Sequence, residues 1–352
     1  MPERTTIFIA QSTMHPEALS ILEAGAQVVW GLPKESRVTY SGVAGVDSDH
    51  PAIREALLEA LPKIDGLFGR FPVDAELIGA ASRLRVIITP SSGAEHIDIA
   101  AATAHGVAVV NAAGANHVPV AEHVFGLVLS LLRQIALADR QAHQDRAQGN
   151  TAQFFDQHGL PAILRGKTLG VIGFGFVGRE VARIGVQGFR MKACAFDPFF
   201  DSVEARRLGV DLVPDLAQLL TDSDVVCVSC PLTPETQGLI GARELSLMKP
   251  AAILVNGSRG GTVVTDDLVS ALKAGTIAGA ALDVTEPEPL PPGHGLFELD
   301  NVVLTPHIAG AAAGVLIDQM VQSARDGMLV LQGRKPFHLV NPEVWSRLRE
   351  AK

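Results

Sequence analysis

The stretch TLGVIGFGFVGREVARIGV, residues 168–186, decides the fold. Its first five residues predict a short buried strand, and residues 179–186 have the apolar spacing of a helix. Between them, Gly173, Gly175 and Gly178 have the spacing G-x-G-x-x-G. A strand, a glycine-rich turn and a helix in this order predict the phosphate-binding unit of a doubly wound parallel sheet.

Each glycine has its own physical task in such a unit. Gly173 permits the tight turn, Gly175 lets the backbone approach a pyrophosphate, and Gly178 lets the helix pack closely on the strand. The helix N-terminus adds N–H donors and the positive end of its dipole. A further strand-like run ends at Asp197, 19 residues after Gly178. A carboxylate there accepts hydrogen bonds from ribose hydroxyls and repels a 2′-phosphate, which predicts NAD rather than NADP.

The same alternation of strand-like and helix-like segments continues along the chain in two blocks. The strand-like runs of the first block are 6–10, 27–30, 66–69, 85–89 and 107–110, and those of the second are 168–172, 192–196, 225–229, 252–255, 277–282 and 302–304. One long helix pattern at 119–148 joins the blocks, and another at 312–332 precedes a proline-rich tail. Alternation of this kind predicts an α/β protein with two parallel sheets, and 352 residues suffice for two domains.

Composition narrows the class of protein. The net charge of −9 disfavours a nucleic-acid partner, which needs a basic surface. The sequence lacks an uncharged apolar run of the ~18 residues that a membrane span requires, and residues 1–4 lead into a strand-like run without the layout of a signal peptide. Three cysteines are too few for a disulfide framework, so we expect a cytoplasmic protein.

Two of these cysteines, Cys227 and Cys230, have C-x-x-C spacing inside an apolar run. A zinc site would need two further ligands at suitable spacing, and a redox pair prefers the start of a helix. We therefore expect both thiols to be structural, and we expect no metal site.

Polar residues follow the strands of the second block, at the edge where parallel sheets bind their ligands. Arg259 follows the run 252–255, Asp283 follows 277–282, and His307 follows 302–304. Glu286 and Glu288 follow Asp283 in a loop rich in proline, and the pattern alone does not say which of the two glutamates faces the site. The sequence thus predicts an arginine, two carboxylates and a histidine beside the dinucleotide turn.

At this point the chain resembles the D-isomer-specific 2-hydroxyacid dehydrogenase family, which includes phosphoglycerate dehydrogenases and glyoxylate/hydroxypyruvate reductases. The motifs that carry the resemblance occur in the family's order: the glycine turn with Asp197, then PLTPET at 231–236, LVNGSRGG at 254–261, AALDVTEPEP at 280–289 and TPHIAG at 305–310.

The resemblance implies an architecture and a partner. It implies two Rossmann-like domains, in which an NAD-binding domain at 115–311 is inserted into a split substrate domain formed by 1–114 and 312–352. It also implies a homodimer supported by the long helix after Pro119.

It further implies roles for individual residues. Arg259, Glu288 and His307 match the catalytic residues, and Asp283 matches the residue that holds the nicotinamide amide. The other positions that match cofactor contacts are Phe176, Val177, Cys230, Gly257, Ser258, Arg259 and the run His307 to Gly310. Ser92 and Gly93 match a loop whose amides meet the substrate carboxylate.

These residue types suit hydride transfer to a 2-keto acid, which builds negative charge on the carbonyl oxygen. The planar fork of Arg259 can bind the carboxylate and carbonyl and stabilise that charge. A protonated His307 can donate to the new alkoxide, and Glu288 would favour the protonated imidazole and fix its orientation. In the reverse direction the neutral imidazole is the general base.

Departures from the family pattern concern the substrate. The loop TPSSGAEHID at 89–98 has serines in place of small flexible residues, and Glu95-His96 in place of the more usual Asp-Asn. Arg70 occupies the place of an arginine that contacts phosphate in phosphoglycerate dehydrogenases. It is therefore a candidate contact for a phosphorylated substrate tail, and a surface ion pair is the alternative.

Three other functions compete with a 2-hydroxyacid dehydrogenase, and the weakest, a purely structural dimer partner, would leave the Gly173 turn and Asp197 without a task. A formate-dehydrogenase-like enzyme shares the scaffold and is faintly similar at EHID, residues 95–98, but it is expected to have glutamine in place of Glu288. A regulatory protein that senses NAD(H) without turnover is the third, because a fold alone does not determine function. The presence of Arg259, Glu288 and His307 together argues against such a sensor.

Overall fold

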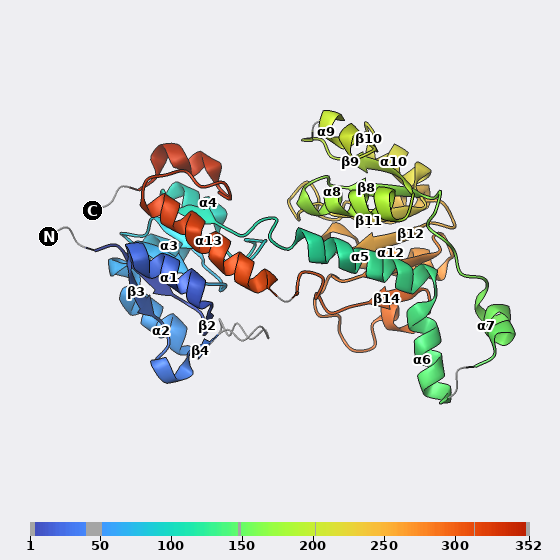
Figure 1. Ribbon diagram of the computed structural model, residues 1–352, viewed down its shortest axis with the longest axis horizontal. Helices are drawn as coiled ribbons and strands as arrows, with labels where there is room; N and C mark the ends of the chain where they lie inside the picture. The colour runs from blue at the N-terminus through green and yellow to red at the C-terminus, as the bar shows by residue number, and fades with distance from the viewer. Residues whose placement is uncertain (1–3, 40–50, 147–148, 201, 313, 350–352) are drawn as a thin grey trace. The chain divides into compact units, whose positions relative to one another are not determined.

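The glycine-rich stretch forms the strand, turn and helix that its residues predict. The buried strand β8 (Thr168–Ile172) is followed after three residues by α8 (Phe176–Arg183), and Gly175 is the N-cap of that helix. The computed structural model (Figure 1) describes residues 4–39, 51–146, 149–200, 202–312 and 314–349. Within it the chain divides into two compact units: residues 1–116 with 311–352 form unit 1, and residues 117–310 form unit 2.

In the described part of unit 2, seven parallel strands form a sheet in the order β10-β9-β8-β11-β12-β13-β14. This is the doubly wound order, whose direction reverses between β8 and β11. The strands are β8, β9 (Lys192–Phe196), β10 (Val210–Leu212), β11 (Val225–Val228), β12 (Ile253–Asn256), β13 (Gly279–Leu282) and β14 (Val302–Leu304). The helices are α5 (His117–Leu132), α6 (Ile135–Asp145), α7 (Thr151–His158), α8, α9 (Ser202–Arg207), α10 (Leu216–Asp222), α11 (Ala242–Leu247) and α12 (Thr265–Lys273).

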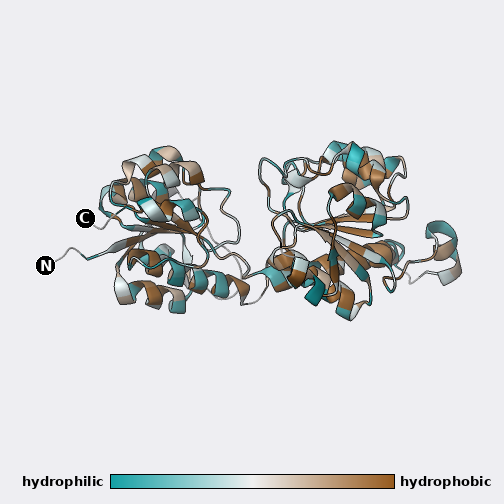
Figure 2. Ribbon diagram, turned by 90° about the horizontal axis from the view of Figure 1, so that it is seen from above, coloured by the Kyte–Doolittle hydropathy of each residue, from teal (hydrophilic) through white to brown (hydrophobic). Residues whose placement is uncertain are grey.

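Both faces of this sheet are covered by helices. Buried residues of α5 and α8 pack on one face, and buried residues of α10, α11 and α12 pack on the other. All four residues of β11 are buried, as expected for the centre of a parallel sheet. Figure 2 shows the corresponding concentration of hydrophobic residues along the strands.

In the described part of unit 1, five parallel strands form a second sheet in the order β3-β1-β5-β6-β7. They are β1 (Thr6–Ile9), β3 (Gln27–Trp30), β5 (Gly66–Phe68), β6 (Val86–Ile88) and β7 (Ala108–Val110), and β2 (Thr13–Met14) pairs separately with β4 (Val38–Thr39). The helices are α1 (Pro16–Gly25), α2 (Pro51–Ala60), α3 (Ala75–Ala80), α4 (Ile99–Ala104) and α13 (Val315–Leu331). Helices α1 and α13 cover one face, and α2, α3 and α4 cover the other. The predicted fold class, two parallel-sheet α/β domains, is confirmed.

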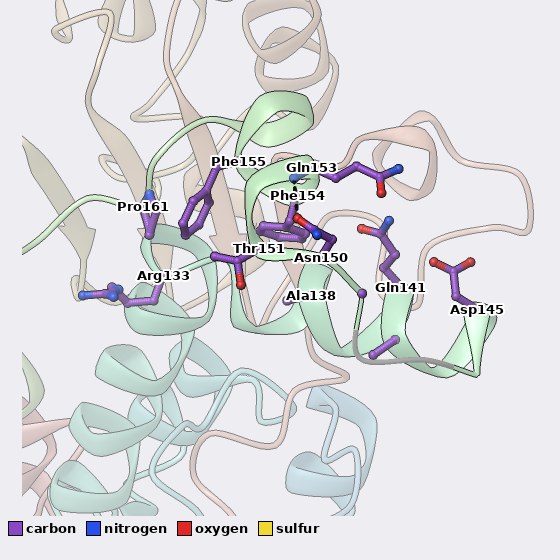
Figure 3. Close-up of a pocket in the computed structure, with 12 residues that line it drawn as sticks. Arg133, Ala138, Gln141, Asp145, Asn150, Thr151, Gln153, Phe154, Phe155 and Pro161 are labelled. Atoms are coloured by element: carbon purple, nitrogen blue, oxygen red, sulfur yellow. Dashed lines mark hydrogen bonds between the residues drawn. The ribbon is translucent and has the colours of Figure 1, made fainter.

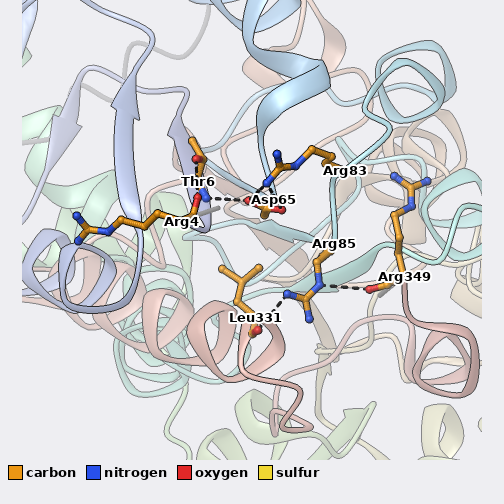
Figure 4. A network of polar contacts seen from close by, with 7 residues as sticks. All are labelled: Arg4, Thr6, Asp65, Arg83, Arg85, Leu331 and Arg349. Atoms are coloured by element: carbon orange, nitrogen blue, oxygen red, sulfur yellow. Dashed lines mark hydrogen bonds and ion pairs between the residues drawn. The ribbon is translucent and has the colours of Figure 1, made fainter. Parts of the chain in front are cut away.

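The C-terminal tail returns to unit 1, where the buried side chain of Arg85 forms hydrogen bonds with it (Figure 4). Arg85 donates from Nε to the Arg349 carbonyl at 3.2 Å and from Nη1 to the Leu331 carbonyl at 3.1 Å. Beside it, Asp65 accepts from the Thr6 amide at 2.8 Å and pairs with Arg83 at 3.2 Å. These bonds join the last described residues to the first strand of the chain, a connection that the sequence pattern does not predict.

The prediction of one long helix at 119–148 is wrong. The structure has two helices, α5 and α6, bent by 61° at a break that contains Gln134 in the left-handed region, with φ 57°. Two bonds from later residues stabilise the break: Gln134 donates to the His158 carbonyl at 2.9 Å, and the Ala162 amide donates to the Leu132 carbonyl at 3.0 Å. Residues 147–148 lie outside the described residues.

No helix in the described residues is by itself both long and apolar enough to span a bilayer; only the bent pair α5 and α6 reaches that length and apolarity together.

Candidate active site

The glycine turn lies where the strand order of unit 2 reverses. Gly173 has φ +86°, and a Cβ there would lie 2.6 Å from the Cys230 amide nitrogen, on the loop that follows β11. A Cβ on Gly178 would overlap the Gly173 carbonyl oxygen. By contrast, a Cβ on Gly175 would meet no atom within 4 Å. Gly173 and Gly178 are therefore required by contacts within the protein, whereas Gly175 leaves open space at the start of α8, where a pyrophosphate can approach.

Asp197 follows β9 and is bonded to the same turn. Its Oδ2 accepts from the Phe174 amide at 2.8 Å, and its Oδ1 accepts from the Phe199 amide at 2.9 Å. A carboxylate can accept about four hydrogen bonds, so both oxygens keep capacity for ribose hydroxyls. The open side at Gly175, the N-terminus of α8 and this carboxylate together fit an NAD dinucleotide.

Arg259 lies in a turn that Asn256 organises. Asn256 is 1% exposed, and its Oδ1 accepts from the Ser258 amide at 3.0 Å while its Nδ2 donates to the Arg259 carbonyl at 3.0 Å. The guanidinium is half-buried and donates from Nη1 to the Ser258 carbonyl at 2.8 Å. A side chain at Gly257 would lie 3.0 Å from Val124 of α5. The backbone on both sides of Arg259 is therefore fixed by contacts inside unit 2.

Asp283 is almost fully buried and holds the turn that carries His307. Its Oδ1 accepts from the Thr305 hydroxyl at 2.7 Å and from the Ile308 amide at 2.9 Å, and its Oδ2 accepts from the Ala309 amide at 2.9 Å. The His307 amide donates to the Asp283 carbonyl oxygen at 2.8 Å. The carboxylate therefore positions residues 305–309, a task that the family resemblance alone does not reveal.

Glu288 and His307 are brought together as predicted. Glu288 Oε1 lies 2.6 Å from His307 Nδ1, and both side chains are 42% exposed. They line a cavity of about 520 Å³, together with residues that include Asp283, Phe297 and Thr305. An imidazole whose Nδ1 meets a carboxylate keeps Nε2 available for proton exchange with a ligand.

The strand register places the arginine on the same edge as this pair. Asn256, Leu282 and Leu304 are aligned across the neighbouring strands β12, β13 and β14. Arg259, Asp283 and His307 follow those three positions within three residues each. A Cβ on Gly260 would overlap the Thr285 backbone, so the arginine turn packs directly on the loop that leads to Glu288.

The candidate substrate residues of unit 1 lie after its parallel strands. Ser92 donates to Asn116 Oδ1 at 2.8 Å, Asn111 Nδ2 donates to the Ser92 carbonyl at 2.7 Å, and Ser91 donates to the Gly93 carbonyl at 2.7 Å. These hydrogen bonds fix the backbone of the loop at residues 89–98, whose serines depart from the family pattern.

Arg70 follows β5 and is exposed. Among the described residues no hydrogen-bond or ion-pair partner of its guanidinium is found, so none of them forms the surface ion pair considered as the alternative. Burial, together with the charge of Arg70, lowers the pKa of His96 below its ordinary value.

Residues 125–309, just over half of the chain, match the family described as D-isomer specific 2-hydroxyacid dehydrogenase, NAD binding domain. The chain belongs to this family. It is similar to the glyoxylate reductase of Thermofilum pendens, 40% identical over 303 residues that cover 84% of this chain and 87% of the relative. It is also similar to the D-3-phosphoglycerate dehydrogenase of Archaeoglobus fulgidus, 41% identical over 290 residues, which cover 82% of this chain but only 53% of the relative. Thus the chain spans about half the length of that relative.

Solved structures agree with this assignment. The D-mandelate dehydrogenase of Rhodotorula graminis in its apo form aligns with a TM-score of 0.81 at 26% identity, covering 96% of this chain and 98% of that one. The expectations of an NAD-dependent oxidoreductase that acts on CH–OH donors, and of NAD(H) as cofactor, are confirmed.

The C-x-x-C cysteines of the dehydrogenase are buried, Cys227 in the centre of β11 and Cys230 just beyond it. Burial raises the pKa of each thiol to about 11. Because only the thiolate reacts readily, we expect a disulfide reagent such as DTNB to modify neither thiol within an hour at pH 8 in the folded protein. Protein unfolded in guanidinium should react with three equivalents of DTNB, one for each cysteine. Rapid modification of Cys227 or Cys230 in the folded protein would contradict this assignment.

Sequence reasoning missed three residues of the site: Asn256, Thr305 and His123. Asn256 had a local signal, because an asparagine directly after a buried strand and before glycine often forms a side-chain turn. Thr305 and His123 had none, because their hydrogen bond joins residues 182 positions apart.

Proposed function

We propose that this dehydrogenase interconverts a small 2-keto acid and the corresponding D-2-hydroxy acid, with Arg259, Glu288 and His307 as its catalytic residues. The observation that carries the proposal is the 2.6 Å contact between Glu288 and His307, on the sheet edge that also bears Arg259 and the glycine turn. NAD(H), when bound, supplies or accepts the hydride at C2 of the substrate.

Arg259 binds the anionic substrate and stabilises the charge that develops on its carbonyl oxygen. A guanidinium presents parallel N–H donors that match a carboxylate or a carboxylate–carbonyl pair. Because Asn256 fixes the turn, little reorganisation of the backbone is needed when that charge appears.

His307 exchanges the proton of the hydroxyl oxygen. In the reductive direction a protonated imidazole donates from Nε2, and in the oxidative direction the neutral ring accepts there. Glu288 accepts from Nδ1, which orients the ring and favours its protonated form. Oxidation of formate involves no hydroxyl proton, so it does not require the acid–base pair of Glu288 and His307. A sensor that binds NAD(H) without turnover does not require this pair either.

The direct test is a screen for NADH consumption over glyoxylate, hydroxypyruvate, phosphohydroxypyruvate, pyruvate and branched 2-keto acids. We expect turnover with at least one of them, and the D-enantiomer of the product on chiral analysis. Binding of NADH without turnover on any 2-keto acid would support the sensor, and NAD reduction by formate alone would support the formate-type enzyme.

On the substrate side, we propose that Ser92 and Gly93 meet the substrate carboxylate and that Arg70 meets a distal anionic group. Arg70 has the free guanidinium for this task, since no described residue pairs with it. Loss of a charged hydrogen bond of about 1.5–3 kcal/mol corresponds to roughly 10–100-fold in affinity. Arg70→Ala should therefore raise the KM for phosphohydroxypyruvate by that factor and leave the KM for hydroxypyruvate within about 2-fold. Equal effects on both substrates would exclude the contact.

We also propose that the dehydrogenase forms a homodimer through the segment from α6 to residue 163. This segment exposes Ile135 at 53%, Leu160 at 80% and Ile163 at 59%, and several large exposed apolar side chains in one segment favour an interface with another protein. A cavity of about 350 Å³ lies in the same segment. Figure 3 shows residues that line it, among them Gln141, Phe154 and Phe155. Light scattering should give a molecular mass of twice the 37.1 kDa of one chain. In Ile163→Asp the measured mass should shift towards that of one chain. A wild-type monomer at 10 µM would contradict the proposal.

A further inference from the structure

A histidine of α5 is hydrogen-bonded to the turn that carries His307. His123 Nε2 lies 3.0 Å from the Thr305 hydroxyl oxygen and 3.5 Å from Asp283 Oδ1. The side chains of His123 and Asp283 are 24% and 1% exposed. None of the motifs that identified the site contains His123.

The direction of these bonds follows from counting protons. The Thr305 hydroxyl has one proton, and it donates that proton to Asp283 Oδ1 at 2.7 Å, because a carboxylate only accepts. The Thr305 oxygen must therefore accept from His123, which requires a proton on Nε2. The result is a directed relay from His123 Nε2–H through the Thr305 hydroxyl to the carboxylate of Asp283.

The relay ends on the group that shapes the His307 turn. The Asp283 carboxylate accepts the amides of Ile308 and Ala309, directly after His307. His307 itself has φ +54°, a left-handed conformation that is unfavourable for a residue with a side chain and persists only when its surroundings enforce it. The bonds before and after His307 provide that enforcement, and His123 braces them from a separate helix.

The relay also joins the two ends of unit 2. The chain enters this unit at His117, at the start of α5, and leaves it at Gly310, just after the turn. His123 therefore fixes the catalytic turn to the segment that begins the unit rather than to the neighbouring strands alone.

We infer that His123 is a positioning residue for this dehydrogenase, whose Nε2–H holds residues 305–309 so that the imidazole of His307 keeps its orientation. This role rests on the proposed function of His307 and goes beyond it. A misplacement of about 1 Å in a reacting group can lower a rate about 10²-fold. Loss of the hydrogen bond from His123 to Thr305 should therefore reduce kcat, whereas contacts with the dinucleotide at the glycine turn stay intact.

The test compares variants at both ends of the relay. His123→Leu removes the donor, and His123→Gln keeps an amide donor at similar reach. Thr305→Val removes the hydroxyl, and Thr305→Ser keeps it. We expect kcat to fall about 10–100-fold in His123→Leu and in Thr305→Val, with the Kd for NADH within about 2-fold of wild type. The Gln and Ser variants should recover to within about 3-fold, and the double variant should be little worse than either single loss, because both act through one relay.

A second measurement does not depend on turnover. Hydrogen exchange of the Ile308 and Ala309 amides in the protein without cofactor should be about 10-fold faster in His123→Leu than in His123→Gln. Near-normal kcat and unchanged exchange in a folded His123→Leu would overturn the inference, as would additive losses in the double variant. If His123→Leu does not fold, His123→Gln against His123→Asn decides, since an asparagine amide falls short of the Nε2 position and should not restore kcat. Inactivity of the wild-type protein would instead refute the proposed function, and the exchange experiment would still decide the brace.

Discussion

Replacement of Arg259 by glutamine should lower kcat/KM for the best 2-keto acid by about 10³-fold or more. Removal of one preorganised donor to a developing oxyanion costs about 10²–10³ in kcat, and loss of the charge also weakens binding of the substrate carboxylate. Glutamine keeps a polar side chain of intermediate length at a half-buried position, so the turn built on Asn256 should persist. Steady-state NADH oxidation at saturating cofactor, with thermal unfolding measured in parallel, tests this expectation.

Arg259→Lys is the matched control. Lysine keeps the positive charge but loses the planar fork, so it should recover part of the loss in KM and little of the loss in kcat. The Kd for NADH should stay within about 3-fold in both variants, because we propose that the dinucleotide is held mainly at the glycine turn and Asp197. Activity within 10-fold of wild type in a folded Arg259→Gln would show that another group carries the oxyanion charge.

The cofactor half of the site could be predicted from sequence because its determinants are local. The turn from Gly173 to Gly178 and the residue Asp197 lie within 25 residues, and Gly173 and Gly178 are required by contacts with the turn itself or with the adjoining loop. The structure adds a bond that the sequence does not predict, from the Phe174 amide of the turn to Asp197.

Residues at strand ends could be predicted for a different reason. In a parallel sheet, all strands end at one edge, so the order of strands brings Arg259, Asp283 and His307 to that edge without any knowledge of side-chain contacts. The pairing of His307 with Glu288 rather than with Glu286 came from the family resemblance, since the proline-rich loop alone did not distinguish the two glutamates.

What could not be predicted depends on contacts between distant segments. The bond from His123 to Thr305 and the bonds from Arg85 to Leu331 and Arg349 join residues more than 180 positions apart. The break at Gln134 is similar, since bonds with the last residue of α7 and with Ala162 stabilise it, although the apolar pattern continues through it. Periodicity reports which face of an element is buried, but it carries no information about which distant polar group will meet it.

Replacement of His307 by alanine should lower kcat by at least about 10²-fold in both directions, because loss of a general acid or base typically costs 10²–10⁴. The Kd for NADH should stay within about 3-fold, since the glycine turn and Asp197 do not contact His307. Measurement of the single-turnover rate together with the Kd separates the loss of proton transfer from a loss of binding. Turnover within 10-fold of wild type would refute His307 as the proton donor.

Glu288→Gln tests the partner of that histidine through the pH dependence of the reaction. Reduction requires a protonated imidazole, so the reductive rate falls as pH rises. A carboxylate beside an imidazole generally favours the protonated ring, and Glu288 Oε1 lies 2.6 Å from His307 Nδ1. Glutamine keeps a hydrogen-bonding group without the charge, so the fall in the reductive rate should move to lower pH while the rate on the acidic side remains closer to that of wild type. The oxidative rate, which needs the neutral ring, should begin to rise at lower pH by the same displacement. If neither the reductive nor the oxidative pH profile shifts relative to wild type, the carboxylate orients the ring without influencing its charge. Another group must then stabilise the imidazolium.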